Sequence, residues 1–127
     1  MPMVRIDMTD EWTQASALDA GEVIYETLMD IFNVPENDKF QIINRHPEGI
    51  MNVAPNFHGN EYSSKIIIIQ IFLNQGRTVE LKKQFYRSLM NRLSERVGCR
   101  PDDVVINLVE VAKENWSFGN GLAQLAE

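Results

Sequence analysis

The sequence has little cysteine, few basic residues and no long apolar run, and each shortage excludes a class of protein. Cys99 is the only cysteine, so no disulfide can form within the chain. Its 12 Lys and Arg against 18 Asp and Glu give a net charge of −6, which disfavours nucleic acids and anionic membranes as partners. The longest apolar run, residues 66–73, falls short of the about 20 residues that a membrane-spanning helix needs. The N-terminus also lacks the apolar core of a signal peptide, so we expect a cytoplasmic protein.

Common catalytic and metal-binding motifs are also missing. His46 and His58 share no ligand spacing with each other or with Cys99, and we therefore expect no metal site. The sequence GNG at 119–121 follows no predicted strand, and the chain contains no GxSxG element. An acid or base for catalysis must come from elsewhere.

Periodic patterns in the first half predict a strand–helix–strand unit. Residues 3–7 alternate apolar and polar side chains, as a strand does. An amphipathic helix, capped by Thr9 and Asp10, is expected to run to about Asn33. Residues 39–43 then predict a second strand.

The second half repeats this plan after an extended loop over residues 45–64, which contain two Pro and two Gly. Residues 65–73 include four consecutive Ile and predict a central strand buried on both faces. Thr78 is expected to cap a helix, and residues 104–111 predict another buried strand before an irregular tail. Apolar residues at i, i+4 spacing mark the core side of this helix: Leu81, Phe85, Leu89, Leu93 and Val97.

The two units predict an α/β (α+β) fold in one domain over residues 1–127. Each strand–helix–strand crossover makes its strands parallel and places its helix on one face of the sheet. Two β-α-β repeats then form a four-stranded sheet with both helices on the same side. The opposite face would be uncovered, and we infer an oligomer because an apolar sheet face requires a partner.

Pro2 directly follows Met1, and a small second residue favours removal of the initiator methionine. Removal would give Pro2 a free secondary amine on a rigid ring. Such an amine is a base, an acid when protonated, and a nucleophile toward carbonyl groups.

Taken together, these features resemble the tautomerase superfamily, and within it the malonate semialdehyde decarboxylase group. The resemblance covers nearly the whole chain and rests on Pro2, the doubled plan, VPEND at 34–38, GRT at 76–78 and NWSFGNG at 115–121. It implies a cofactor-free enzyme that acts on a small oxo acid and assembles as a homotrimer of β-α-β repeats.

The resemblance also implies roles for particular residues. Pro2 would be the catalytic amine, Asp38 an acid that supports the reaction beside it, and Arg77 the group that binds the substrate carboxylate. Trp116 and Phe118 match aromatic residues that wall the pocket.

The chain departs from the decarboxylase pattern near Arg77. That pattern carries two arginines close together, whereas here only Arg77 matches and Asn74 or Gln75 stands where the other guanidinium would be. We expect Asn74 to contact the substrate in its place.

The protonation state of Pro2 leaves two reactions open. A neutral amine would act as a general base in keto–enol tautomerisation. A protonated amine would polarise a carbonyl oxygen and favour decarboxylation of a 3-oxo acid such as malonate semialdehyde. Asp38 and the missing arginine favour the protonated form. A single arginine also binds a carboxylate less strongly than two, which favours a different substrate. A non-catalytic trimeric binding module is the third alternative.

Overall fold

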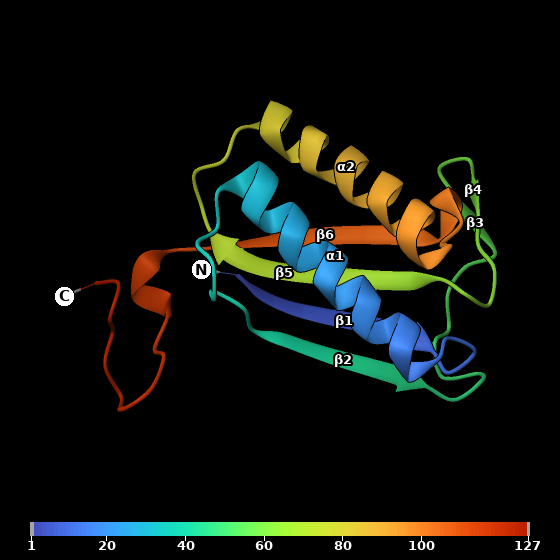
Figure 1. Ribbon diagram of the computed structural model, residues 1–127, viewed down its shortest axis with the longest axis horizontal. Helices are drawn as coiled ribbons and strands as arrows, with labels where there is room; N and C mark the ends of the chain where they lie inside the picture. Colours follow the sequence, from blue (N-terminus) through green and yellow to red (C-terminus); the bar gives the residue numbers. More distant parts are fainter. Residues whose placement is uncertain (1, 127) are drawn as a thin grey trace.

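A mixed four-stranded sheet with both helices on one face organises the protein, as the sequence predicts (Figure 1). The computed structural model describes residues 2–126, so the predicted removal of Met1 concerns a residue outside that range. The main elements are β1 (Met3–Thr9), α1 (Gln14–Phe32), β2 (Gln41–His46), β5 (Ile67–Asn74), α2 (Val79–Val97) and β6 (Val104–Val111). Across the sheet their order is β2-β1-β5-β6, with parallel pairs within each repeat and antiparallel pairing of β1 with β5.

The core lies between the helices and one face of β1 and β5. Alternate residues of β5, among them Ile67, Ile69 and Ile71, are fully buried there. The rings of Phe32 on α1 and Phe85 on α2 stack with centroids 4.4 Å apart, which joins the two helices. Within residues 2–126, no helix is both long enough and apolar enough to cross a membrane.

Within one chain, β5 is buried on one face only, and not on both faces as predicted. Its burial alternates strictly, and Ile68, Gln70 and Phe72 on the face away from the helices are only half-buried. The run of Ile reflects a central strand paired on both sides, but both helices cover the same face. The predicted open face is therefore present.

The predicted start of the first helix is also wrong, whereas the cap of the second is confirmed. Thr9 ends β1, and its hydroxyl donates to Ser64 O at 2.8 Å instead of capping a helix. The cap of α1 is Thr13, whose Oγ1 accepts from Ser16 N at 3.1 Å. In α2 the predicted Thr78 accepts from the backbone of residue 81 at 3.1 Å.

The second strand begins two residues later and ends three residues later than predicted. Parallel pairing with β1 runs from Val4 with Gln41 to Thr9 with His46, so part of the predicted loop belongs to β2. His46 Nε2 lies 2.6 Å from Asp7 Oδ1 on this strand pair. The rest of the predicted loop contains a short hairpin, β3 (Asn56–Phe57) and β4 (Asn60–Glu61).

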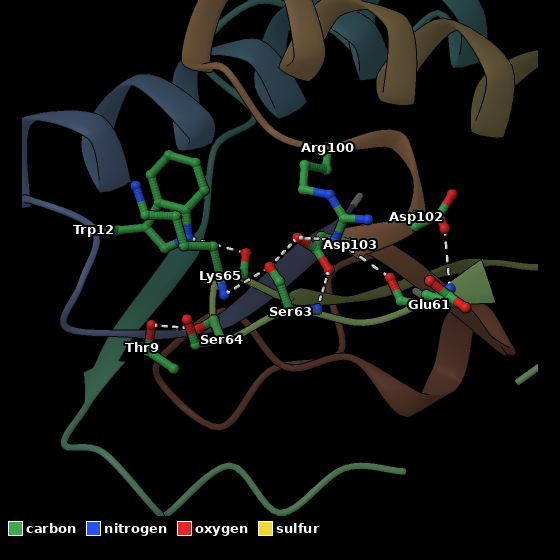
Figure 2. A network of polar contacts seen from close by, with 9 residues as sticks. All are labelled: Thr9, Trp12, Glu61, Ser63, Ser64, Lys65, Arg100, Asp102 and Asp103. Atoms are coloured by element: carbon green, nitrogen blue, oxygen red, sulfur yellow. Dashed lines mark hydrogen bonds and ion pairs between the residues drawn. The ribbon is translucent and has the colours of Figure 1, made fainter. Parts of the chain in front are cut away.

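Buried Asp103 anchors this long loop at the end of the sheet where β1 finishes (Figure 2). Asp103 belongs to the 3-10 turn η1 (Pro101–Asp103). Its carboxylate accepts from Ser63 N at 2.8 Å, from the Ser63 hydroxyl, and from Arg100 Nη1 at 3.2 Å. Neighbouring Asp102 accepts from Glu61 N at 2.9 Å from a more exposed position.

Replacing Asp103 by Ala is expected to lower the free energy of unfolding by about 2–3 kcal/mol, because the half-buried donors of Ser63 and the guanidinium of Arg100 lose a buried charged acceptor. Asp102→Ala is the matched control and should cost about 1 kcal/mol or less. Urea unfolding of both variants at one protein concentration measures the difference. Equal losses for the two variants would contradict the assignment of Asp103 as the anchor.

Candidate active site

Strand register brings the beginning of the chain to the end of the sheet opposite the Asp103 anchor. Met3 pairs with Phe72 near the end of β5, while Val4 pairs with Gln41 at the start of β2. Val4 N also donates to Phe40 O at 2.8 Å. Figure 1 shows the N-terminal end beside the tip of β5, with the red C-terminal tail extending beyond the same edge.

Pro2 and Asp38 approach this edge on neighbouring chain segments. Pro2 is buried immediately before β1, and half-buried Asp38 precedes β2. Asp38 follows a turn that is fixed by its own N–H, which donates to Pro35 O at 3.2 Å, and by Asn37 N, which donates to Tyr25 Oη at 2.8 Å. Because β1 and β2 are parallel and Val4 pairs with Gln41, the segments that precede both strands lie at the same end of the sheet.

Arg77 lies in the turn after β5, where its half-buried guanidinium is held by backbone oxygens. Nη1 donates to Asn74 O at 2.9 Å and Nη2 to Phe32 O at 3.4 Å, while the guanidinium carbon lies 4.9 Å from the Phe32 ring centroid. Phe32 is the last residue of α1, so the cation lies at the negative end of that helix. Burial lowers the pKa of Arg77 from its ordinary value, and the charge of Glu110 opposes this.

Glu110 on β6 fixes the turn that carries Arg77. Its carboxylate accepts from Gly76 N at 3.3 Å and from Lys82 Nζ at 2.7 Å. Gly76 has a φ of 127°, which L side chains rarely adopt. The Lys82 hydrogen bond is the main cause that holds the pKa of Glu110 below its ordinary value, with Gly76 N–H and Arg77 contributing.

Aromatic side chains line a hollow of about 450 Å³ at the same edge. Trp116 Nε1 donates to Asn74 Oδ1 at 2.8 Å, and the Trp116 and Phe118 rings stack with centroids 5.5 Å apart. The Phe40 ring packs beside that of Phe118, with centroids 6.3 Å apart. The lining residues are Met3, Phe40, Asn115, Trp116, Ser117 and Phe118.

The structure therefore brings the predicted site residues together in two groups. Asn74 contacts both Arg77 and Trp116, and Trp116 contacts Phe118. Pro2 and Asp38 reach the same edge through strand pairing, and Met3, next to Pro2, lines the hollow.

Sequence reasoning missed Phe40 and Glu110. Phe40 was assigned only to the strand pattern of residues 39–43, although its place two residues after Asp38 was a usable signal. Glu110 gave no signal, because its role depends on a turn 34 residues earlier in the chain. Within residues 2–126, no group of three or more His, Cys, Asp or Glu side chains is arranged to hold a metal ion.

Comparisons with known proteins agree with this fold. The family model described as "Tautomerase enzyme" matches residues 38–119. The chain is 35% identical to "Probable tautomerase YusQ" of Bacillus subtilis (strain 168) over 127 residues, which is all of both chains.

Solved structures share the architecture. FG41 malonate semialdehyde decarboxylase, inhibited by 3-bromopropiolate, superposes with a TM-score of 0.89 at 29% identity, covering 96% of this chain and 92% of that one. A fused 4-OT symmetric trimer has the same fold, with a TM-score of 0.79 at 21% identity and 98% of each chain covered. The protein therefore has the tautomerase fold, and the chain belongs to the tautomerase enzyme family.

Acidification should weaken the turn that Glu110 holds. A carboxylate whose pKa falls on folding contributes stability above its unfolded pKa of about 4.5, and loses it as the pH falls through the lowered value. Wild-type protein should therefore lose more stability between about pH 6 and about pH 3 than Glu110→Gln. Urea unfolding at the two pH values tests this, and parallel losses in both proteins would contradict it.

Proposed function

We propose that the protein is a cofactor-free tautomerase that uses the amine of Pro2 on a small oxo acid. Membership of the tautomerase family supports tautomerase-type catalysis. The observation that carries the finer proposal is the strand register, which directs the segments of Pro2, Asp38 and Arg77 to one edge, beside an aromatic hollow. The proposal requires that Met1 is removed, because an amide nitrogen is not basic.

In the proposed reaction, Arg77 binds the substrate carboxylate and orients the enol or keto group toward Pro2. Guanidinium and carboxylate match in a bidentate, charge-assisted pair. A neutral Pro2 nitrogen takes the proton of the enol hydroxyl as the carbonyl forms, and the resulting ammonium delivers a proton to the adjacent carbon. Each turnover restores the amine, so no cofactor is consumed. Asp38 stabilises the ammonium form between the two transfers.

Decarboxylation of malonate semialdehyde or a similar 3-oxo acid is the second candidate, favoured by the similarity to the FG41 decarboxylase. Here protonated Pro2 would polarise the carbonyl oxygen while the bond to the carboxylate carbon breaks. Carbon dioxide leaves, the bond electrons form a carbon–carbon double bond, and the carbonyl oxygen takes the Pro2 proton to give an enol. The carbon then takes up a proton while the enol hydroxyl returns its own to Pro2. Asn74 in place of a second guanidinium weighs against this candidate, because Arg77 would hold the carboxylate alone.

We also propose that the protein acts as a homotrimer. The face of the sheet away from the helices carries half-buried or exposed apolar residues, including Ile42, Ile68 and Phe72, and such a face requires a partner. The fused 4-OT of the same fold is described as a symmetric trimer. Light scattering of the purified protein should give three times the chain mass of 14.6 kDa, and a monomer would contradict the assembly.

Substituting Pro2 tests the proposed catalytic amine. Pro2→Ala is expected to lower kcat/KM for phenylenolpyruvate ketonisation by about 100-fold or more, the range expected when a general acid–base is lost. Intact-mass measurement must first show that Met1 is absent from the wild-type protein. Pro55→Ala, in an exposed loop, is the control and should retain full activity. An unchanged rate in Pro2→Ala, or retention of Met1, would contradict the proposal. If the wild-type trimer, with Met1 removed, catalyses neither phenylenolpyruvate ketonisation nor malonate semialdehyde decarboxylation, the result would favour the non-catalytic binding module.

Removing the Arg77 guanidinium should show whether this residue acts in substrate binding or in the chemical step. Arg77→Ala is expected to raise KM by about 10-fold or more, because a charge-assisted hydrogen bond contributes about 1.5–3 kcal/mol. Arg87→Ala, which removes an exposed arginine from α2, serves as the matched control. Steady-state kinetics with both phenylenolpyruvate and malonate semialdehyde would show which reaction depends on Arg77. Unchanged KM values for both substrates would exclude Arg77 as the carboxylate ligand.

A further inference from the structure

The side chain of Asn74, the last residue of β5, forms a hydrogen bond with Trp116 in the C-terminal tail. Its Oδ1 accepts from Trp116 Nε1 at 2.8 Å, whereas its backbone oxygen accepts from Arg77. Other hydrogen bonds of the tail, from Phe118 N and from the Gln124 amide, close within the tail itself. The Asn74 bond therefore fixes where the tail lies against β5.

We propose that Asn74 is a positioning residue that holds the Trp116–Phe118 stack against Phe40, so that the hollow selects oxo acids with a flat apolar group over those with a second carboxylate. This inference rests on the proposed function and names the substrate class of the same site. It also changes the expected role of Asn74, from direct substrate contact to placement of the wall that contacts substrate.

The geometry of the rings favours a flat apolar group. The Trp116 and Phe118 rings are inclined by only 20°, and Phe40 faces Phe118 at 33°. Phe40 is 49% exposed and Phe118 36% exposed, and their ring centroids are 6.3 Å apart. A substrate ring would therefore lie against the aromatic surface that these rings share, and would remove that surface from water. Met3 adds a further apolar lining.

The charges at this edge disfavour a second carboxylate. Position 74 carries a neutral amide and no second cation, and the neighbouring cation Arg77 is assigned to the first carboxylate. Lys39 beside Phe40 already pairs with Glu22 and lies 5.0 Å from the Tyr25 ring centroid. A second carboxylate against the aromatic wall would lose hydration without gaining a cation.

Two matched enol acids test the selectivity. Phenylenolpyruvate and the enol of oxaloacetate share the reacting carbons and carboxylate, and differ only in a phenyl or carboxylate substituent. The wild-type protein should prefer the phenyl substrate. Asn74→Leu should lower that preference by about fivefold or more, the effect of one lost hydrogen bond. The loss should appear in KM for the phenyl substrate with kcat retained, because the backbone oxygen that binds Arg77 remains.

A double-mutant cycle isolates the Asn74–Trp116 bond. Trp116→Phe removes the indole donor while keeping an aromatic ring, and its combination with Asn74→Leu should be no worse than either single variant. Trp12→Phe is the matched control, because Trp12 Nε1 donates to Lys65 O at 3.0 Å at the opposite end of the sheet. That control should leave the substrate preference unchanged. Additive losses in the cycle would overturn the positioning role.

Fluorescence gives a readout that does not depend on activity. Since the chain has two Trp, Trp12→Phe leaves Trp116 as the only indole. In this background Asn74→Leu should increase quenching of Trp116 by acrylamide, and Asn74→Asp, which keeps an acceptor oxygen, should not. Equal quenching in the two variants would overturn the proposal.

The outcomes separate this inference from the function on which it rests. If Pro2→Ala abolishes turnover while Asn74→Leu leaves the preference unchanged, the inference fails and the proposed function stands. If Pro2→Ala leaves turnover intact, the proposed function fails, and the selectivity proposal for that site fails with it.

Discussion

The pairing of β1 between β2 and β5 is the constraint on which the site depends. A strand held by hydrogen bonds on both sides cannot shift by one residue without reversing its buried face. Val4, Ile6 and Met8 are all buried under the helices, so the register is fixed by the core. Pro2, one residue before this strand, is consequently fixed at one edge of the sheet.

The same edge collects groups from both repeats because the second repeat runs antiparallel to the first. The start of β1 therefore meets the end of β5 and the turn that carries Arg77. The end of α1 supplies a carbonyl to that guanidinium, which explains why an arginine is favourable just before α2. The opposite end of the sheet carries the Asp103 anchor, which holds the long loop away from the proposed site.

Much of this arrangement could be predicted from local patterns, and the remainder depends on long-range contacts. Helical periodicity and the Thr78 cap predicted α2, and the apolar residues of 104–111 predicted the bounds of β6. The predicted burial of β6 is wrong, because it is the outermost strand of the sheet and none of its residues is buried. The start of α1 could not be predicted locally, because the Thr9 hydroxyl donates to the backbone oxygen of Ser64, 55 residues away, and does not cap a helix. Nothing local in the sequence shows that the Asn74 side chain accepts from Trp116, 42 residues later.

The central claim is that a free amine at Pro2 lies beside one carboxylate and one guanidinium, and its titration tests this most directly. In protein labelled with ¹⁵N-proline, the Pro2 resonance should shift with pH as an amine does. Because opposite charge stabilises the ammonium form, Asp38→Asn should lower the pKa of Pro2 and Arg77→Ala should raise it. A resonance that does not titrate, or a pKa unchanged by both substitutions, would contradict the account.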